Sequence, residues 1–151
     1  MPKDKAPLGR TDADAQYNRG VTYEVGQVVP QSYAEAAKWF RKAAEQGYAK
    51  AQYNLGLMHA DGTGVYWSDA EAVKWYSMAA EQGVAQAQYN LGVMYYNGEG
   101  VPVNNFKAYM WLSLAKAQSD ETAVTGLDIV KKQMTPSQIA KAQALATDPK
   151  R

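Results

Sequence analysis

The hexapeptide AQYNLG occupies residues 51–56 and recurs unchanged at residues 87–92. A near copy, AQYNRG, occupies residues 15–20, so three copies follow one another at a spacing of 36 residues. An internal period of this length is typical of repeat proteins, in which each unit is one supersecondary structure that stacks on its neighbours. The sequence therefore predicts a repeat architecture, and it raises the question of why each copy ends in glycine.

Many further positions recur at the same spacing. Outside the hexapeptide, the recurring residues include Trp39, Trp75 and Trp111, Gly26, Gly62 and Gly98, and Ala36, Ala72 and Ala108. Each unit contains two stretches of helical periodicity separated by a glycine-rich turn, which predicts a helix, a loop and a second helix. In the middle unit, the first helix is expected from about Tyr48 to Ala60, and the second is expected to open at Ser68.

The second helices carry recognisable start signals. SYAE at Ser32 and SDAE at Ser68 match a capping box, and Asn104 occupies the same position in the third unit. In a capping box the hydroxyl accepts from the N–H three residues on, while the glutamate reaches back to the N–H of the cap residue. Thr135 and Gln138 predict another box near the end of the chain.

The repeated glycines Gly20, Gly56 and Gly92 lie inside the predicted first helices, where glycine costs about 1 kcal/mol relative to alanine. A cost repeated three times indicates a steric requirement, and we expect the second helix of the same unit to approach closely. The expected contact surface is the pair of alanines at 43–44 or 79–80, with the repeated tryptophans alongside. A phosphate-binding role is not favoured, because a GxGxxG turn requires a preceding strand and none is predicted.

These patterns predict an all-α fold, an α/α superhelical solenoid of about three helix-loop-helix repeats followed by a C-terminal capping helix pair. Residues 1–10 are expected to form a flexible N-terminal segment, and residues 149–151 a short tail. A single repeat domain is expected over residues 11–148, with repeats at about 11–46, 47–82 and 83–118 and the cap at 119–148. The capping pair is expected to begin at Ser119 and to end with a helix over about 136–147.

Composition restricts the possible chemistry. The absence of cysteine excludes disulfides, thiol catalysis and cysteine-rich zinc sites. The single histidine, His59, cannot form a multi-histidine metal site or a Ser-His-Asp triad within one chain, and it is expected to replace a packing tyrosine. An SxxK string occurs at Ser113–Lys116, but no KTG or SDN companion accompanies it. We therefore expect no catalytic residues, no metal site and no cofactor.

Charge and hydropathy restrict the partners. The formal net charge is +1 and basic residues are interspersed among acidic ones, so no strong positive potential is expected that would attract nucleic acid phosphates. No apolar run approaches the roughly 18 residues that a membrane helix needs, so we expect a soluble protein without membrane insertion. The polar start lacks the apolar core of a signal peptide. The location is therefore expected to be cytoplasmic as the sequence is written, or periplasmic if a leader was removed.

The stretch AQYNLGVMYYNGEGVP, followed by KAYMWLSLA, resembles the Sel1-like repeat, a relative of the tetratricopeptide repeat. The resemblance covers roughly residues 11–118, and MTPSQIAKAQALA resembles the closing helix often found after such arrays. It implies an α/α solenoid that serves as a scaffold for protein complexes, in bacteria and in membrane-associated quality control in eukaryotes. It implies no catalytic residues. The expected function is a non-catalytic interaction scaffold or adaptor that binds a peptide or protein partner on the concave face.

By analogy with the tetratricopeptide register, the concave face presents the tyrosine and asparagine of each hexapeptide, together with an apolar residue one turn later. Asparagine can both donate to and accept from a peptide group, and tyrosine supplies apolar area at low entropy cost. The alternative is that these residues only bond to neighbouring helices. The predicted partner-binding residues on this face are Tyr17, Asn18, Tyr53, Asn54, Leu57, Tyr89, Asn90 and Val93.

Two loop residues complete the predicted partner-binding set. Tyr66 and Trp67 occupy a loop position where the sister units carry proline and small or polar residues. Exposed aromatic side chains are common at binding hot spots. The alternative is that Trp67 folds back over the adjacent hairpin.

Two other functions compete with the scaffold prediction. Some cysteine-rich relatives in the resembling family are linked to β-lactam binding, so a cell-wall-related or small-ligand binding protein is one alternative, although this chain lacks those cysteines. A self-assembling structural module that stacks through its own ends is the other, which makes an oligomer possible.

Overall fold

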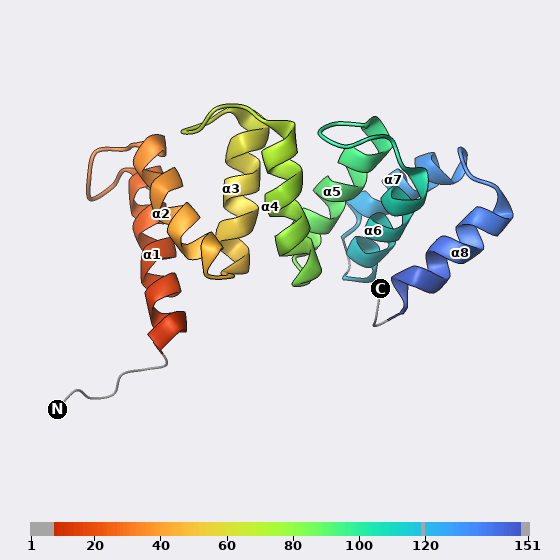
Figure 1. Cartoon of the computed structure of the whole chain (residues 1–151), viewed down its shortest axis with the longest axis horizontal. Helices are drawn as coiled ribbons and strands as arrows, with labels where there is room; N and C mark the ends of the chain where they lie inside the picture. The colour runs from red at the N-terminus through yellow and green to blue at the C-terminus, as the bar shows by residue number, and fades with distance from the viewer. Residues whose placement is uncertain (1–7, 119, 149–151) are drawn as a thin grey trace. The chain divides into compact units, whose positions relative to one another are not determined.

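The computed structural model describes residues 8–118 and 120–148, and every regular element within these ranges is an α-helix (Figure 1). This confirms the all-α prediction. The helices are α1 (Leu8–Val25), α2 (Tyr33–Glu45), α3 (Ala49–Asp61), α4 (Asp69–Glu81), α5 (Ala85–Asn97), α6 (Asn105–Ala117), α7 (Thr122–Lys131) and α8 (Pro136–Ala146). The predicted cap residue Ser119, the tail 149–151 and residues 1–7 lie outside the described residues.

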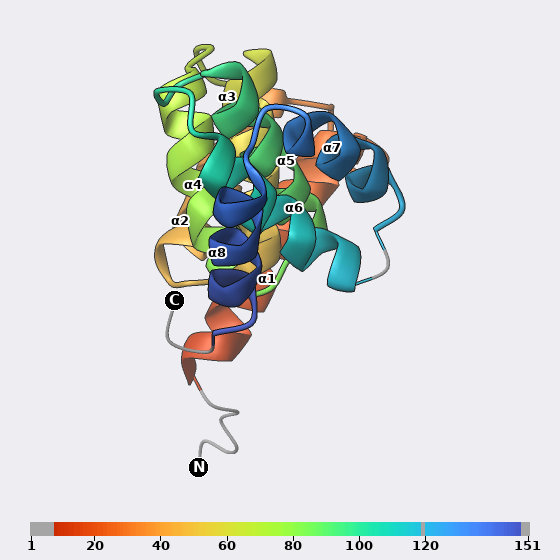
Figure 2. The same ribbon diagram turned by 90° about the vertical axis from the view of Figure 1, so that its right-hand side faces the viewer.

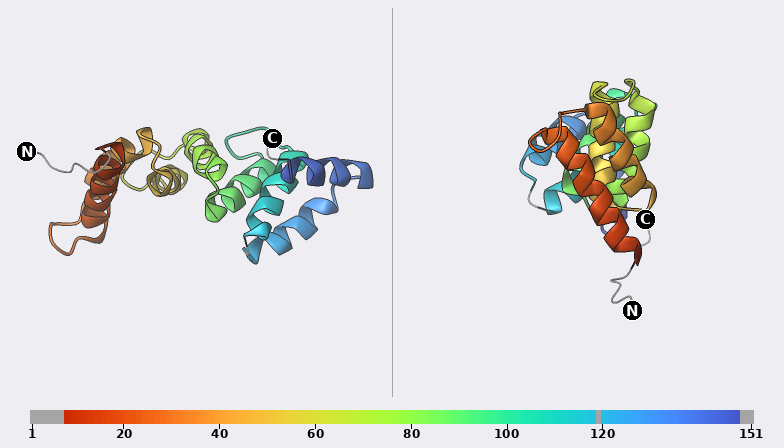
Figure 3. Two further views of the ribbon diagram at one scale, coloured as in Figure 1. Left: turned by 90° about the horizontal axis from the view of Figure 1, so that it is seen from below. Right: turned by 90° about the vertical axis from the view of Figure 1, so that its left-hand side faces the viewer.

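The helices belong to two compact units, residues 1–78 and residues 79–151, and the division falls within α4. In the first unit, α1 packs on α2 and α2 packs on α3. In the second unit, α5 packs on α6, and α6 lies between α7 and α8 (Figures 2 and 3). The α1–α2 and α5–α6 pairs are thus predicted helix-loop-helix hairpins, and the two helices of the predicted closing segment, α7 and α8, each pack on α6.

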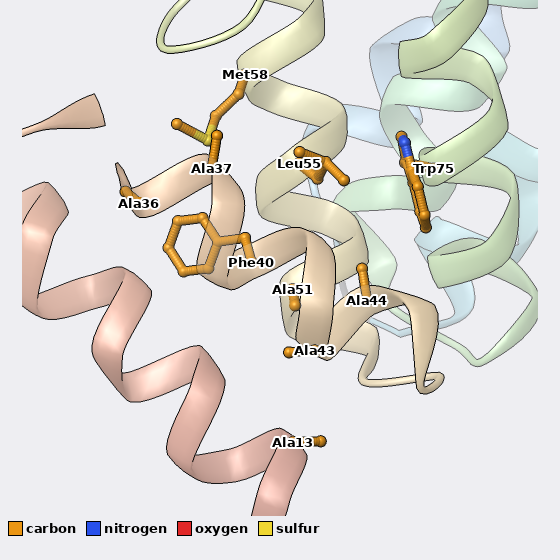
Figure 4. Packing of buried hydrophobic residues seen from close by; sticks show 10 residues of the cluster. All are labelled: Ala13, Ala36, Ala37, Phe40, Ala43, Ala44, Ala51, Leu55, Met58 and Trp75. Atoms are coloured by element: carbon orange, nitrogen blue, oxygen red, sulfur yellow. The ribbon is translucent and has the colours of Figure 1, made fainter. Parts of the chain in front are cut away.

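The core of the first unit is built mostly from alanine and a few large side chains. Phe40 and Leu55 have no exposed surface, and Met58 and Trp75 are nearly as well covered. Figure 4 shows the Phe40 ring pointing from α2 toward α1, with Leu55 and Met58 on α3. The small alanines let neighbouring helices approach closely enough for these few large groups to fill the space between them.

The repeated glycines do mark a close helix approach, but the predicted contact residues were wrong. A Cβ atom on Gly20 would lie 2.5 Å from the Phe40 ring, and one on Gly56 would lie 2.6 Å from the Tyr76 ring. The alanine pairs 43–44 and 79–80 are fully buried in the cores. The glycines face the large residue that follows each repeated tryptophan instead, because the rotation of the second helix presents that residue to the first.

The predicted capping boxes of the second helices form only in half. The Ser32 hydroxyl accepts from the Glu35 N–H at 3.1 Å, as predicted. The backbone N–H of Ser32 is not available to the Glu35 side chain, because it donates to the Tyr23 carbonyl at 3.0 Å. The equivalent N–H groups of Ser68 and Asn104 donate to the carbonyls of His59 and Tyr95. The loop between the paired helices is thus closed by a backbone hydrogen bond, and the complete predicted box forms at Thr135 and Gln138.

The recurrent glutamine of the hexapeptide has a structural role that the sequence analysis missed. Gln52 and Gln88 are buried, and their side-chain amides donate to the carbonyls of Ala44 and Ala80, the last buried alanines of the preceding helices. These carbonyls lie near helix ends and also accept from the N–H groups of Gly47 and Gly83, so each glutamine adds a second donor to a carbonyl of the last turn. Each glutamine therefore fixes the first helix of a repeat to the helix before it.

Candidate functional site

A groove lies in the first unit where the end of α1 meets α3. We call it the α1–α3 groove, and its volume is about 200 Å³. Two of the predicted partner-binding residues, Asn54 and Leu57, line it. The complete lining is Glu24, Asn54, Leu57, Met58, Asp61 and Thr63.

The α1–α3 groove is acidic and carries polar groups without internal partners. Burial raises the pKa of the Glu24 carboxyl above its ordinary value near 4.5. Within the described residues, no basic side chain forms an ion pair with Glu24 or Asp61, and the ion pair of that region joins Lys38 to Glu35. The Asn54 side-chain amide likewise makes no hydrogen bond to another described residue. These groups are free to interact with a ligand.

A second groove lies in the second unit, between α5 and α7 over α6, and has a volume of about 240 Å³. We call it the α5–α7 groove. Two further predicted residues, Tyr89 and Val93, line it, together with Leu112 of α6 at its base. No charged side chain is among the lining residues, which are Tyr89, Val93, Tyr96, Asn97, Leu112, Thr122, Thr125, Gly126, Ile129 and Val130. This groove suits an apolar group.

The two grooves occupy the same place in the repeat. Their lining residues correspond in pairs that are two repeat periods apart in the sequence, namely Glu24 with Tyr96, Asn54 with Gly126, Leu57 with Ile129, and Met58 with Val130. The apolar pair at the last two positions is common to both grooves. The charge of Glu24 is special to the first groove, and the second has glycine at the position of Asn54.

The other residues predicted for the concave face lie at helix interfaces or outside the two grooves. The Tyr17 ring packs between Phe40 and Tyr48, with ring centroids 5.5 and 5.1 Å apart, and so contributes to the core edge. Tyr53 lies 5.9 Å from Tyr76 in a similar contact. Asn18 is exposed and Asn90 is half-buried, and neither lines a groove described above. The structure therefore gathers Asn54 with Leu57 and Tyr89 with Val93.

The aromatic pair in the second loop is exposed. Trp67 has 66% of its surface accessible and Tyr66 has 70%. The Tyr66 ring nevertheless rests edge-on against His59, with centroids 5.3 Å apart. Trp67 therefore presents the free aromatic surface that the contact hypothesis requires, whereas Tyr66 is partly held by the hairpin.

His59 is a packing residue, as the sequence suggests. It is fully buried, and its Nδ1 lies 3.1 Å from the Tyr66 carbonyl while its Nε2 lies 3.4 Å from the Arg41 guanidinium. Because a carbonyl only accepts and a guanidinium only donates, Nδ1 carries the proton and Nε2 accepts. Both ring nitrogens are thus engaged within the fold.

Glu24 and Asp61 are the groove residues that sequence reasoning missed. Neither belongs to the recurring hexapeptide, and the positions one repeat later hold Ala60 and Asn97. The described residues contain no group of three or more acidic or histidine side chains placed to hold a metal ion. Nor does any described helix combine the length and apolar character needed to cross a membrane.

Comparisons with known proteins agree with this architecture. The family model described as "Sel1 repeat" matches three consecutive blocks, residues 13–48, 49–84 and 85–120. No curated protein matches the chain.

Two solved structures of bacterial proteins are similar. One is a protective antigen present in uropathogenic Escherichia coli strains that displays an SLR fold, with 40% identity and a TM-score of 0.73, covering 76% of this chain and 24% of that chain. The other is a Sel1 repeat protein from Oxalobacter formigenes, with 38% identity and a TM-score of 0.76, covering 82% of this chain and 49% of that chain. The chain thus corresponds to less than half of either protein. It belongs to the Sel1 repeat family.

Proposed function

We propose that the chain is a non-catalytic interaction module that binds extended segments of a partner protein in the α1–α3 and α5–α7 grooves. The observation that carries this proposal is the recurrence of one groove position in two units, each lined by residues predicted for the binding face. Small apolar-walled grooves with a few convergent polar groups are typical ligand sites. The free amide of Asn54 can pair with a peptide group in such a segment.

The proposal is tested by selecting peptides from a random displayed library on the full chain. Asn54→Ala and Val93→Ala are expected to weaken binding of selected peptides by about tenfold, the loss expected for a hydrogen bond or an apolar contact in a desolvated site. Gln86→Ala, an exposed residue of α5 outside both grooves, is the matched control. Absence of any saturable peptide binding would overturn the proposal.

Thermal unfolding separates a binding role of Asn54 from a structural one. The Asn54 amide has no hydrogen-bond partner among the described residues, so Asn54→Ala should change stability by no more than about 0.5 kcal/mol. The stability and peptide binding of Asn90→Ala are measured in parallel, to learn whether predicted residues outside the groove linings also contact the peptide. A large stability loss on Asn54→Ala would assign the amide to the fold instead.

Trp67, in the loop after α3, is proposed as an additional contact residue. Its equivalent in the next repeat loop is Val103, which is 61% exposed and provides a matched control. Trp67→Ala is expected to weaken capture of the partner by about tenfold, because buried aromatic anchors dominate interface energies, whereas Val103→Ala should not. Full protection of Trp67 from a fluorescence quencher in the free protein would contradict this role.

The non-catalytic part of the proposal has its own test. Ser113 is half-buried within α6 and Lys116 is exposed, so the SxxK string is part of a repeat helix. Hydrolysis of nitrocefin by the chain, lost in Ser113→Ala, would refute it.

A further inference from the structure

The α1–α3 groove differs from its counterpart in charge, and this difference identifies a ligand group. We propose that the α1–α3 groove binds the cationic side chain of a lysine or arginine in the partner segment. This inference rests on the proposed function and adds the chemistry of one bound residue. Its basis is the combination of a cavity, two carboxylates without a cation, and an apolar wall.

The carboxylates are the first part of the argument. Glu24 and Asp61 come from different helices, line the same cavity, and form no ion pair with a basic side chain in the part of the chain that the structure describes. Glu24 is half-buried, and its desolvation raises the pKa of its carboxyl. A half-buried carboxylate that has lost part of its hydration and has no basic partner is unfavourable unless a cation approaches, and the exposed Asp61 adds negative charge to the same groove. A bound ammonium or guanidinium group would offset the desolvation of Glu24.

The rest of the lining fits the remainder of such a side chain. Leu57 and Met58 supply an apolar wall for the aliphatic stem, which lysine and arginine commonly pack against apolar surface while the charged head reaches polar groups. The Asn54 amide oxygen and the Thr63 hydroxyl are neutral acceptors in the same cavity. A cationic head has only donors to offer, so a lining rich in acceptors matches it.

The equivalent groove provides an internal comparison. Two repeats on, Tyr96 stands at the position of Glu24 and Gln133 at that of Asp61, and the α5–α7 groove keeps the apolar wall with no charged side chain among its lining residues. The apolar wall is thus a property of the repeat, whereas the two carboxylates are particular to the first unit. Selectivity for a cation is therefore expected in the α1–α3 groove alone.

A titration followed by NMR tests the inference directly. With 13C-methyl-methionine label, the Met58 methyl reports on the α1–α3 groove, and the probes are N-acetyl-argininamide, N-acetyl-lysinamide and the neutral N-acetyl-citrullinamide. We expect saturable shifts of Met58 with at least one cationic probe and binding at least about tenfold weaker with the neutral one. Comparing the two cations distinguishes a guanidinium site from an ammonium site, and either supports the inference.

Isosteric variants provide the control. The double variant E24Q/D61N is expected to weaken cation binding about tenfold, whereas E45Q/E81Q, which changes the net charge equally at exposed positions, should leave it unchanged. Equal binding of citrullinamide, or wild-type binding by E24Q/D61N, would overturn the inference. If selected peptides bind through Asn54 without any cation response at Met58, the inference fails and the proposed function stands. If the cations bind but no peptide does, the proposed function fails, and so does the assignment of the bound cation to a lysine or arginine of a partner segment.

Discussion

The α1–α3 and α5–α7 grooves share a place in the repeat and differ in the chemistry of their linings. Both have an apolar wall, Leu57 with Met58 in one and Ile129 with Val130 in the other. The first adds two carboxylates and a free amide, and the second adds tyrosines and the buried Leu112. The comparison teaches that the repeat fixes where a groove forms, while the residues at a few lining positions, such as Glu24 and its counterpart Tyr96, set what it can hold.

The largest expected effect concerns the base of the α5–α7 groove. Leu112 is 1% exposed, so Leu112→Ala should lower the free energy of unfolding by about 2–5 kcal/mol through lost burial and a new cavity. Ile129, on the wall of the same groove, is 45% exposed, and Ile129→Ala should cost less than about 1 kcal/mol. Urea unfolding followed by circular dichroism compares the two. Equal losses would mean that the wall is as much a part of the core as the base.

The next effect concerns the two glycines that face Leu112. A Cβ on Gly92 would lie 2.8 Å from Leu112 Cγ and 3.2 Å from the Ala108 carbonyl, whereas one on Gly126 would lie 3.3 Å from a Leu112 methyl. Alanine gains about 1 kcal/mol of helix propensity at either position, and overpacking costs about 1–3 kcal/mol. We expect Gly92→Ala to destabilise by about 1 kcal/mol and Gly126→Ala to be neutral or stabilising in the same urea assay. Stabilisation by both would contradict the close approach at Gly92.

The smallest expected effect is a pH dependence confined to the α1–α3 groove. Because burial raises the pKa of Glu24, the folded state holds the proton more tightly than the unfolded chain does. The resulting stability is fully present below the ordinary value near 4.5 and is lost as pH rises through the raised pKa. Glu24→Gln should therefore gain thermal stability relative to wild type between about pH 4 and pH 7. Glu45→Gln, at an exposed carboxyl, serves as the comparison, and an identical trend in both variants would remove Glu24 as the cause.

Most of the fold could be predicted from the sequence because identical residues recur at a fixed period. The helix hairpins and the steric role of the glycines follow from that recurrence. The groups that face the glycines could not be predicted in the same way, because Phe40, Tyr76 and Leu112 share a position and a large volume but not an identity. The reciprocal half of the capping boxes was predicted wrongly, because the N–H of the cap residue donates to a carbonyl nine residues earlier and not to the glutamate, as at Ser32.

The candidate site was predictable to the extent that it uses consensus residues. Asn54, Leu57, Tyr89 and Val93 lie in the grooves, and all belong to the recurring first-helix pattern. Glu24 was not predicted as a groove residue. It lines the groove only because the end of α1 meets α3, and the sequence gives no sign of this, since the equivalent positions in the later repeats are not acidic. The exposure of Trp67 is likewise a property of the folded loop.

The backbone hydrogen bond that closes each interhelical loop has a consequence for how such chains can change in length. The bonds from Ser32 to Tyr23, from Ser68 to His59 and from Asn104 to Tyr95 each lie within a single repeat. Each bend is therefore closed by a backbone hydrogen bond within its own repeat, although Gly64 in the second bend also packs closely on the backbone of Tyr33 in the preceding repeat. Whole repeats can consequently be duplicated or deleted during evolution with this hydrogen bond intact, whereas gaining or losing a single residue inside a bend would break it.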